Sequence, residues 1–226
     1  MNHSKESLSE QAYRLLKNDI ITCELPPGEQ IAQAVLTERY QIGITPVREA
    51  LQRLAQEGFV QSLPRLGTVV TPITFSDVHE MYELRMIVEV AAVRLAALRA
   101  PQQALNQLIA RSDFSYIYQN VESYKVFLGQ NRDFHMAIAR LSGNQRLVDL
   151  VSNLLDELTR LFHLGLGIRD SAAEMHHAHT ALAQAIQQRD PDQAEQIMRE
   201  EIEMSQNRVL EALTQKSTLP SPGLYL

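Results

Sequence analysis

The 226-residue sequence predicts a mainly α fold with two parts, an N-terminal winged helix-turn-helix and an all-helical bundle of six or seven helices. Two observations support this prediction. Before residue 75, three segments with helical apolar periodicity precede two short runs rich in β-formers. After residue 76, apolar residues recur at helical spacing and no strand pattern is found. We therefore expect domains at 1–75 and 76–216, followed by a flexible tail at 217–226.

The composition is that of an ordinary globular protein, with 45% hydrophobic and 21% charged residues. No run approaches the roughly 20 apolar residues of a membrane span. The single cysteine, Cys23, cannot form an internal disulfide, which fits a reducing cytoplasm. Residues 1–75 carry seven Lys and Arg against eight Asp and Glu. Any DNA binding there must depend on a few cations gathered on one face.

Two helices are expected before residue 41. Leu8 to Thr22 carries one apolar stripe, and the Pro26-Pro27-Gly28 run breaks the chain after it. Ala32 to Tyr40 forms a second, shorter helical segment. The link at 41–44 is short and contains a glycine, which is typical of a helix-turn-helix.

The third helix is expected between Thr45 and Gly58. Thr45 is a suitable N-cap, and Pro46 then occupies the first helical position. The opposite side from its apolar stripe carries Arg48 and Gln52. This shape is typical of a DNA recognition helix, and equally of an ordinary surface helix. The stripe comprises Val47, Ala50, Leu51 and Leu54.

A β-hairpin follows this helix. Residues 59–63 and 68–71 read as strands, and residues 64–67 between them read as a tight turn. Helix, turn, helix and hairpin together form a winged helix-turn-helix, with the hairpin tip as the wing. The DNA contacts expected from the helix and the wing are Thr45, Arg48, Gln52, Arg65 and Gly67.

The second domain shows seven helical segments separated by breaks near Pro101, Asp113, Gly143, Gly167 and Pro191. Short breaks between amphipathic helices are typical of an antiparallel bundle. The segments are expected at 77–99, 102–111, 113–118, 120–141, 144–167, 171–188 and 191–214.

Four polar residues lie on or beside the apolar stripes of this bundle. Asn131 and His135 share one helical face at i, i+4 spacing, while His179 and Glu201 lie on the stripes of two later helices. Buried groups of this kind need partners. A divalent metal such as Zn²⁺, Ni²⁺ or Mn²⁺ would suit all four. A hydrogen-bonded polar cluster explains the same pattern and stays open.

Several motifs together resemble a known family. The Pro26-Pro27-Gly28-Glu29 run and the 45–51 run are similar to the N-terminal domain of GntR-type bacterial transcription regulators. The 82–92, 131–138 and 179–194 motifs are similar to the FCD effector domain of the FadR-like branch. The resemblance implies a homodimeric, cytoplasmic regulator that binds double-stranded operator DNA and a small organic-acid effector.

The chain departs from the family pattern both among the metal ligands and in the DNA-reading segment. Metal-binding relatives show Asp-x-x-x-His and two later histidines. Here His135 and His179 match, but Asn131 stands for the aspartate and Glu201 for the third histidine. A neutral amide is a weaker ligand than a carboxylate. Ile44 also stands where many relatives carry an arginine that can read guanine, so we expect a different operator.

Arg85 is a charged residue on an apolar stripe of the first bundle helix. A buried guanidinium needs a carboxylate. Glu89, one turn further along, could supply it. Alternatively, as the resemblance implies, Arg85 clamps an organic-acid effector, and Arg160 and His163 help to line its pocket.

Two other functions stay open at this point. His135, His179 and Glu201 could serve a metal-dependent hydrolase or lyase, although no general base, phosphate loop or H-E-x-x-H motif accompanies them. The winged helix could also bind a protein rather than DNA. The motifs as a set favour a transcription regulator that is not an enzyme.

Overall fold

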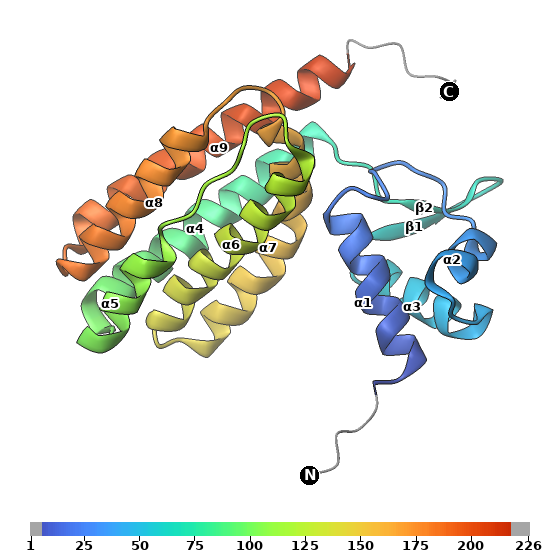
Figure 1. Ribbon diagram of the computed structural model, residues 1–226, viewed down its shortest axis with the longest axis horizontal. Helices are drawn as coiled ribbons and strands as arrows, with labels where there is room; N and C mark the ends of the chain where they lie inside the picture. Colours follow the sequence, from blue (N-terminus) through green and yellow to red (C-terminus); the bar gives the residue numbers. More distant parts are fainter. Residues whose placement is uncertain (1–5, 218–226) are drawn as a thin grey trace. The chain divides into compact units, whose positions relative to one another are not determined.

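The computed structural model describes residues 6–217, which form nine helices and one two-stranded hairpin (Figure 1). The chain divides into two units between Thr74 and Phe75, one residue before the division expected from the sequence. The mainly α fold class is confirmed. Of the predicted tail, Ser217 ends the last helix, and 218–226 lie outside the described residues. None of the described helices is long and apolar enough to cross a membrane.

The first unit contains the predicted helix-turn-helix. Its helices are α1 (Leu8–Ile21), α2 (Gln33–Tyr40) and α3 (Ile44–Gln56). Gln41 ends α2 in the left-handed conformation, at φ 54°, and the next residue, Ile42, is buried. This turn brings the apolar face of α3 against α1 and α2. The shared core comprises Leu16, Ile20, Leu36, Val47, Ala50, Leu51 and Leu54.

The predicted N-cap of α3 was wrong by two residues. Gly43 is the N-cap, with an extended backbone at ψ 162°, and Thr45 lies inside the first turn with an exposed side chain. Pro46 is tolerated at the third position of the helix because the first four amides of a helix have no intrahelical acceptor. Thr45 therefore does not cap the helix, and its side chain faces solvent.

The wing forms as predicted. Strand β1 (Val60–Leu63) pairs antiparallel with β2 (Gly67–Val70), with Val60 opposite Val70. The segment before α2 extends this hairpin, because the Ile31 amide donates to the Thr68 carbonyl at 2.8 Å and the Val70 amide donates to the Glu29 carbonyl at 2.8 Å. These bonds tie the base of the wing to the helical core.

The second unit is a bundle of six helices, as the sequence predicts, and its described residues contain no strand. Side-chain caps start two helices, because Asn120 accepts from the Ser123 amide and Asn144 from the Leu147 amide. Helix α4 packs against α6, α7, α8 and α9. The helices are α4 (Phe75–Arg99), α5 (Gln102–Arg111), α6 (Val121–Leu141), α7 (Gln145–Leu166), α8 (Ala172–Gln187) and α9 (Pro191–Ser217).

The helix predicted at 113–118 was wrong. This segment, here called the strap, is extended and connects α5 to α6 along the bundle (Figure 1). Phe114 and Tyr116 are buried, whereas Asp113, Ser115 and Ile117 are exposed. This alternation has period two, which belongs to an extended chain and cannot form one helical face. The strap packs its aromatic side chains onto the bundle, and the Tyr116 hydroxyl accepts from the Ser171 amide at 3.0 Å.

Candidate functional site

Most cations of the first unit are tied to carboxylates of the same unit. Arg53 pairs with Glu10 at 2.9 Å and with Glu57 at 3.2 Å, and its guanidinium lies 3.6 Å from the centroid of the Tyr13 ring. These contacts hold the last turns of α3 to α1. The other pairs are Arg14 with Glu6, Lys17 with Glu57, and Arg39 with Asp19.

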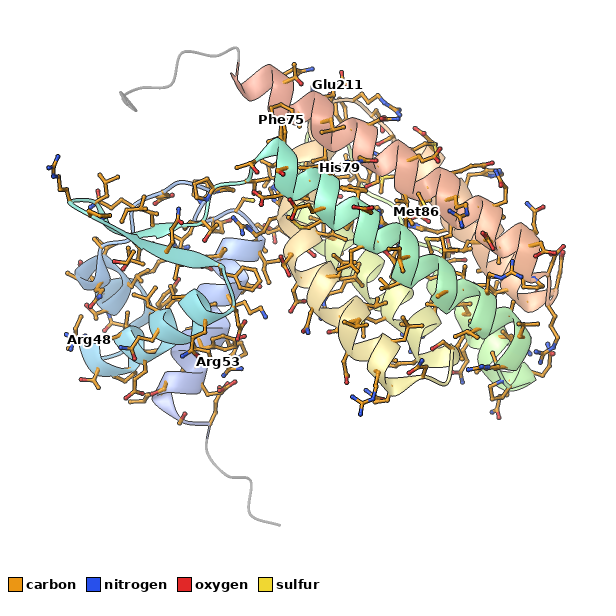
Figure 2. All side chains as sticks on the ribbon, turned by 180° about the vertical axis from the view of Figure 1, so that it is seen from behind. Arg48, Arg53, Phe75, His79, Met86 and Glu211 are labelled. Atoms are coloured by element: carbon orange, nitrogen blue, oxygen red, sulfur yellow. The ribbon has the colours of Figure 1, made fainter. Side chains whose placement is uncertain are left out.

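Arg48 and Arg65 differ from these cations. Both side chains are exposed, and neither forms an ion pair with any residue in the described part of the unit. Arg48 projects from α3 (Figure 2), and Arg65 lies in the wing turn, where its φ of 68° is left-handed. Thr45 and Gln52 are also exposed on α3. Among the described residues of the first unit, the predicted contact set therefore holds the two cations that remain available to neutralise phosphates.

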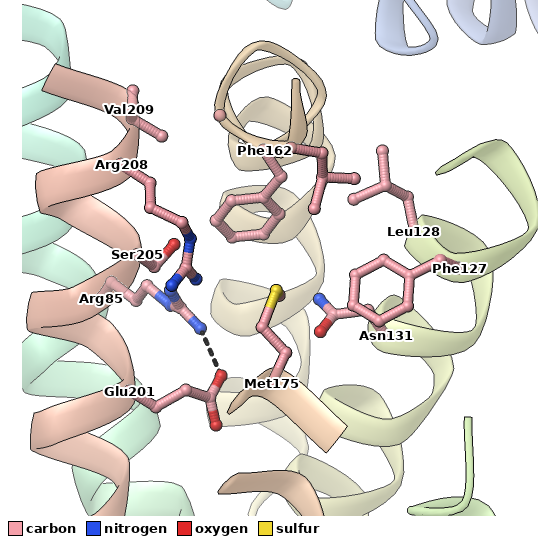
Figure 3. Close-up of a pocket in the computed structure, with 12 residues that line it drawn as sticks. Arg85, Phe127, Leu128, Asn131, Phe162, Met175, Glu201, Ser205, Arg208 and Val209 are labelled. Atoms are coloured by element: carbon pink, nitrogen blue, oxygen red, sulfur yellow. Dashed lines mark hydrogen bonds and ion pairs between the residues drawn. The ribbon is translucent and has the colours of Figure 1, made fainter. Parts of the chain in front are cut away.

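A buried polar cluster in the second unit draws its residues from α4, α6, α8 and α9. The four predicted ligands are all buried, with exposed fractions of 5% or less. The structure brings three of them together: the ligand atoms of His135, His179 and Glu201 all lie within 4.8 Å of one another. Asn131 is buried beside them and lines the adjoining cavity (Figure 3). The predicted inward direction of these side chains is therefore correct.

Glu201 Oε1 is the point on which the imidazoles converge. It lies 3.2 Å from His135 Nε2 and 3.6 Å from His179 Nε2. Within the described part of the chain, neither His179 nitrogen has a hydrogen-bond partner, and Glu201 Oε2 has none either. Leaving such buried groups unsatisfied costs about 1–3 kcal/mol each. Two imidazoles and a carboxylate form a donor set that zinc sites use, so these residues fit a divalent metal.

Glu89 connects this cluster to Arg85. One carboxylate oxygen lies 2.5 Å from His135 Nδ1, and the other accepts from Arg85 Nε at 2.5 Å. Burial alone would lower the pKa of His135, but Glu89 and Glu201 raise it to about 9. Burial would raise the pKa of Glu89, but Arg85 and His135 lower it to about 2. A carboxylate on Nδ1 orients the imidazole so that Nε2 faces Glu201.

Arg85 has the carboxylate partner suggested by the sequence, and its role as an effector clamp stays a prediction. It pairs with Glu89, and its second terminal nitrogen donates to Glu201 Oε1 at 3.3 Å. It also lines the cavity, and its remaining terminal nitrogen has no hydrogen-bond partner. Arg160 and His163 lie on α7 outside the residues that line this cavity, so their effector role stays a prediction.

The cavity is small and mostly apolar. Its volume is about 20 Å³, which admits roughly one water molecule. Figure 3 shows Met175 between the charged side chains of Arg85 and Glu201 and the opposite wall with Asn131 and Phe127. The apolar lining comprises Phe127, Leu128, Phe162, Gly165, Leu166, Met175 and Val209.

Two polar residues of the cavity were missed from the sequence. Ser205 and Arg208 lie on α9, one and two turns beyond Glu201, and both are buried. The stripe that includes Glu201 continues through them at spacings of three and four residues. Extending that periodicity past Ile202 would have found both.

Comparisons with known proteins agree with this arrangement. The model for the gntR family of bacterial regulatory proteins matches residues 8–70, and the model for the FCD domain matches residues 80–212. The HTH-type transcriptional repressor RspR of Escherichia coli (strain K12) is 25% identical over 198 residues, which are 88% of this chain and 87% of RspR. The repressor GlaR of the same strain is 27% identical over 198 residues, 84% of this chain and 90% of GlaR.

Solved structures show the same fold. Escherichia coli McbR/YncC is 23% identical with a TM-score of 0.70, covering 93% of this chain and 99% of that one. A GntR regulator from Rhodococcus sp. RHA1 is 21% identical with a TM-score of 0.73, and the match covers 90% of this chain and 98% of that one. At these identities the likeness concerns the fold alone.

Proposed function

Because the chain belongs to the gntR family of bacterial DNA-binding transcription regulators and carries an FCD domain, we propose that a small organic acid controls its binding to operator DNA. The acid binds in the cavity of the helical bundle, next to a divalent metal held by the buried cluster. The protein acts as a homodimer, since two-fold symmetric operators require two readers.

The DNA contacts rest on one observation above all. Arg48 and Arg65 are the exposed cations of the helix and wing that no carboxylate of the described chain neutralises. Each can release a counterion from a phosphate or donate to a base edge. Gln52 and Thr45 supply polar groups on the same helix, and exposed Ile44 supplies an apolar contact for a thymine methyl.

The metal proposal rests on the unsatisfied atoms of the buried cluster. His135, His179 and Glu201 would hold the ion, and Asn131 would offer an amide oxygen. Glu89 keeps the His135 ring in the orientation that directs Nε2 to the site. The bound metal would add positive charge beside the cavity, which favours an anionic effector.

The cavity adjoining the cluster is the effector site in this proposal. It has the cationic Arg85 on one side and hydrocarbon on the other. An acid can change DNA binding only if it prefers one of two arrangements of the dimer. Since the cavity admits about one water molecule, binding of the acid must shift the lining side chains and can thereby select one arrangement.

The decisive experiment is selection of bound sequences from a random DNA pool by the purified protein. The selection is carried out with the protein alone, with added Zn²⁺, and with Zn²⁺ plus acetate, lactate or citrate. We expect enrichment of a palindrome with two half-sites, and a dependence on one of the additions. An Arg48→Ala variant serves as the matched control and should enrich poorly. A pool without enrichment under every condition would overturn the proposal.

A further inference from the structure

We propose that Arg208 anchors the acidic group of the effector and that the rest of the effector is hydrocarbon. The expected class is a monocarboxylic acid with an aromatic or branched aliphatic body. This inference rests on the proposed function, because it names the chemistry of the ligand that occupies the same cavity.

Arg208 is the charged residue of the cavity that has no ion-pair partner in the described chain. It is 5% exposed, one terminal nitrogen has no hydrogen-bond partner, and no carboxylate of residues 6–217 lies within ion-pair distance of it. Burial lowers the pKa of Arg208 from its ordinary value, although the guanidinium stays charged at neutral pH. Its guanidinium lies on the same side of the cavity as that of Arg85 (Figure 3).

The neighbouring carboxylates are already engaged. Glu89 accepts from Arg85 and lies against His135. Glu201 accepts from Arg85 and faces both imidazoles. Glu174, the carboxylate that most raises the pKa of Arg208, pairs with Arg169 at 2.7 Å. Arg85, the anchor predicted from the sequence, therefore pairs with two carboxylates, while Arg208 pairs with none in the described chain. An uncompensated buried charge is strongly unfavourable, so an anionic ligand group is the missing partner of Arg208.

The hydrocarbon lining defines the rest of the ligand. The residues around the guanidinium include Phe162 and Val209, and the facing wall carries Phe127 and Leu128. The nearby hydroxyl of Ser205 is already bonded to Tyr82 at 2.7 Å. Extra hydroxyl or carboxyl groups placed against Phe127, Leu128 and Phe162 would face hydrocarbon without partners, which is costly. A single acidic group on an apolar body matches both surfaces.

The side chain of Met175 can move to make space for the ligand. Its side chain stands in the cavity, is only half-buried, and has three flexible torsions (Figure 3). Displacing it toward solvent would open space next to Arg208 without moving a helix. The hydrocarbon body of the ligand then takes the place of the Met175 side chain against the aromatic rings.

Calorimetric titration of the full chain with three probes tests this inference. The probes are 3-phenylpropionate, its uncharged analogue 3-phenylpropionamide, and the polar diacid succinate. A charge-assisted hydrogen bond at a buried site predicts that 3-phenylpropionate binds at least about tenfold more tightly than the amide. The apolar wall predicts that it also binds more tightly than succinate.

Two variants of α9 test whether Arg208 causes the preference for the acid over the amide. Arg208→Met removes the charge with similar volume and should bring the affinity ratio of acid to amide to about one. Arg199→Met is the matched control, because Arg199 pairs with Glu195 at 2.7 Å and does not line the cavity, and its ratio should be unchanged. The thermal midpoint of ligand-free Arg208→Met should equal or exceed that of the unmodified protein, since an unpaired buried charge is removed.

Three results would overturn the inference. They are tighter binding of succinate than of 3-phenylpropionate, an unchanged acid-to-amide ratio in Arg208→Met, or no binding of any probe. A different result would contradict the proposed function: neither these acids nor acetate, lactate or citrate would alter binding to operator DNA.

Discussion

The ring of Phe114 stacks on the imidazole of His179, with the centroids 4.7 Å apart and the planes inclined by 27°. Phe114 comes from the strap, and its ring also lies 5.4 Å from that of Phe127 and 6.0 Å from that of Phe134. A residue of an extended connection thus fixes the ring of a candidate metal ligand on α8. The strap is part of the core that supports the site.

Replacing Phe114 should therefore destabilise the helical bundle. We expect Phe114→Ala to lower the free energy of unfolding by about 3–5 kcal/mol, because it leaves a cavity between the rings of Phe127, Phe134 and His179. Ile117→Ala, on the same strap but 67% exposed, should change it by less than about 0.5 kcal/mol. Urea unfolding followed by circular dichroism measures both. Equal effects of the two variants would show that the strap is not packed as described.

Glu201 should decide whether the protein retains a metal. Glu201→Gln removes the only carboxylate among the three converging groups, so Zn²⁺ affinity should fall at least about tenfold. Glu203→Gln, two residues away with an exposed side chain, is the control and should bind as the unmodified protein does. Metal content after dialysis and titration with Zn²⁺ provide the measurement. Equal affinities in the two variants would argue for a polar cluster without metal.

Asn131 should limit that affinity. Asn131→Asp adds a second carboxylate at the buried position that lines the cavity, and a charged oxygen binds a divalent cation more strongly than an amide. We expect Zn²⁺ to bind more tightly, while the metal-free variant becomes less stable because the new charge is buried. A competition titration against a chelator detects the gain. An unchanged affinity would place Asn131 outside the coordination sphere.

Arg48 and Arg53 should have different effects although both lie on α3. Arg48→Ala should weaken binding to the selected operator by about 1–3 kcal/mol with little change in stability. Arg53→Ala should instead lower stability by roughly 1 kcal/mol, because Arg53 pairs with Glu10 and Glu57 and covers Tyr13. Electrophoretic mobility shift and urea unfolding, applied to both variants, separate the two effects. The opposite assignment would mean that another face of the unit contacts DNA.

Acid should loosen the contact between α1 and α3 through Glu57. Burial alone would raise the pKa of this carboxyl, but hydrogen bonds from Tyr13 and Lys17 hold it below its ordinary value of about 4.5. A carboxyl with a lowered folded-state pKa stabilises the fold above its unfolded-state pKa and loses that contribution as the pH falls further. Amide exchange in α1 and α3 should therefore speed up below about pH 4.5. Glu57→Gln should weaken this pH dependence, whereas Glu38→Gln should not.

Most of the fold could be predicted because its signals are local. Helical periodicity located nine helices, and the glycine-containing link between α2 and α3 located the turn. The errors were local too. Gly43 took the capping position expected for Thr45, and a strap with period-two burial was taken for a helix because six residues are too few to separate the two periods.

The candidate site was predicted in part. Polar residues on apolar stripes indicated the inward direction of His135, His179 and Glu201, and the structure places their ligand atoms together. Ser205 and Arg208 were missed because the stripe was followed only as far as Ile202. Glu89 could be named as a partner of Arg85 because the two residues are one turn apart on the same helix. The contact between Glu89 and His135 joins two helices, so neither helix shows it as a pattern in its own sequence.

The sequence by itself determined the order and kind of the elements, the polar groups that point inward, and the family to which the motifs belong. Periodicity and caps depend on neighbours within a few residues, so they can be read along the chain. The tertiary structure alone decided which charges are neutralised. It pairs Arg53 and Arg85 with carboxylates and leaves Arg48, Arg65 and Arg208 without one in the described chain. Ion pairs between helices depend on distances in space, and composition cannot show which of several cations remains available to a ligand.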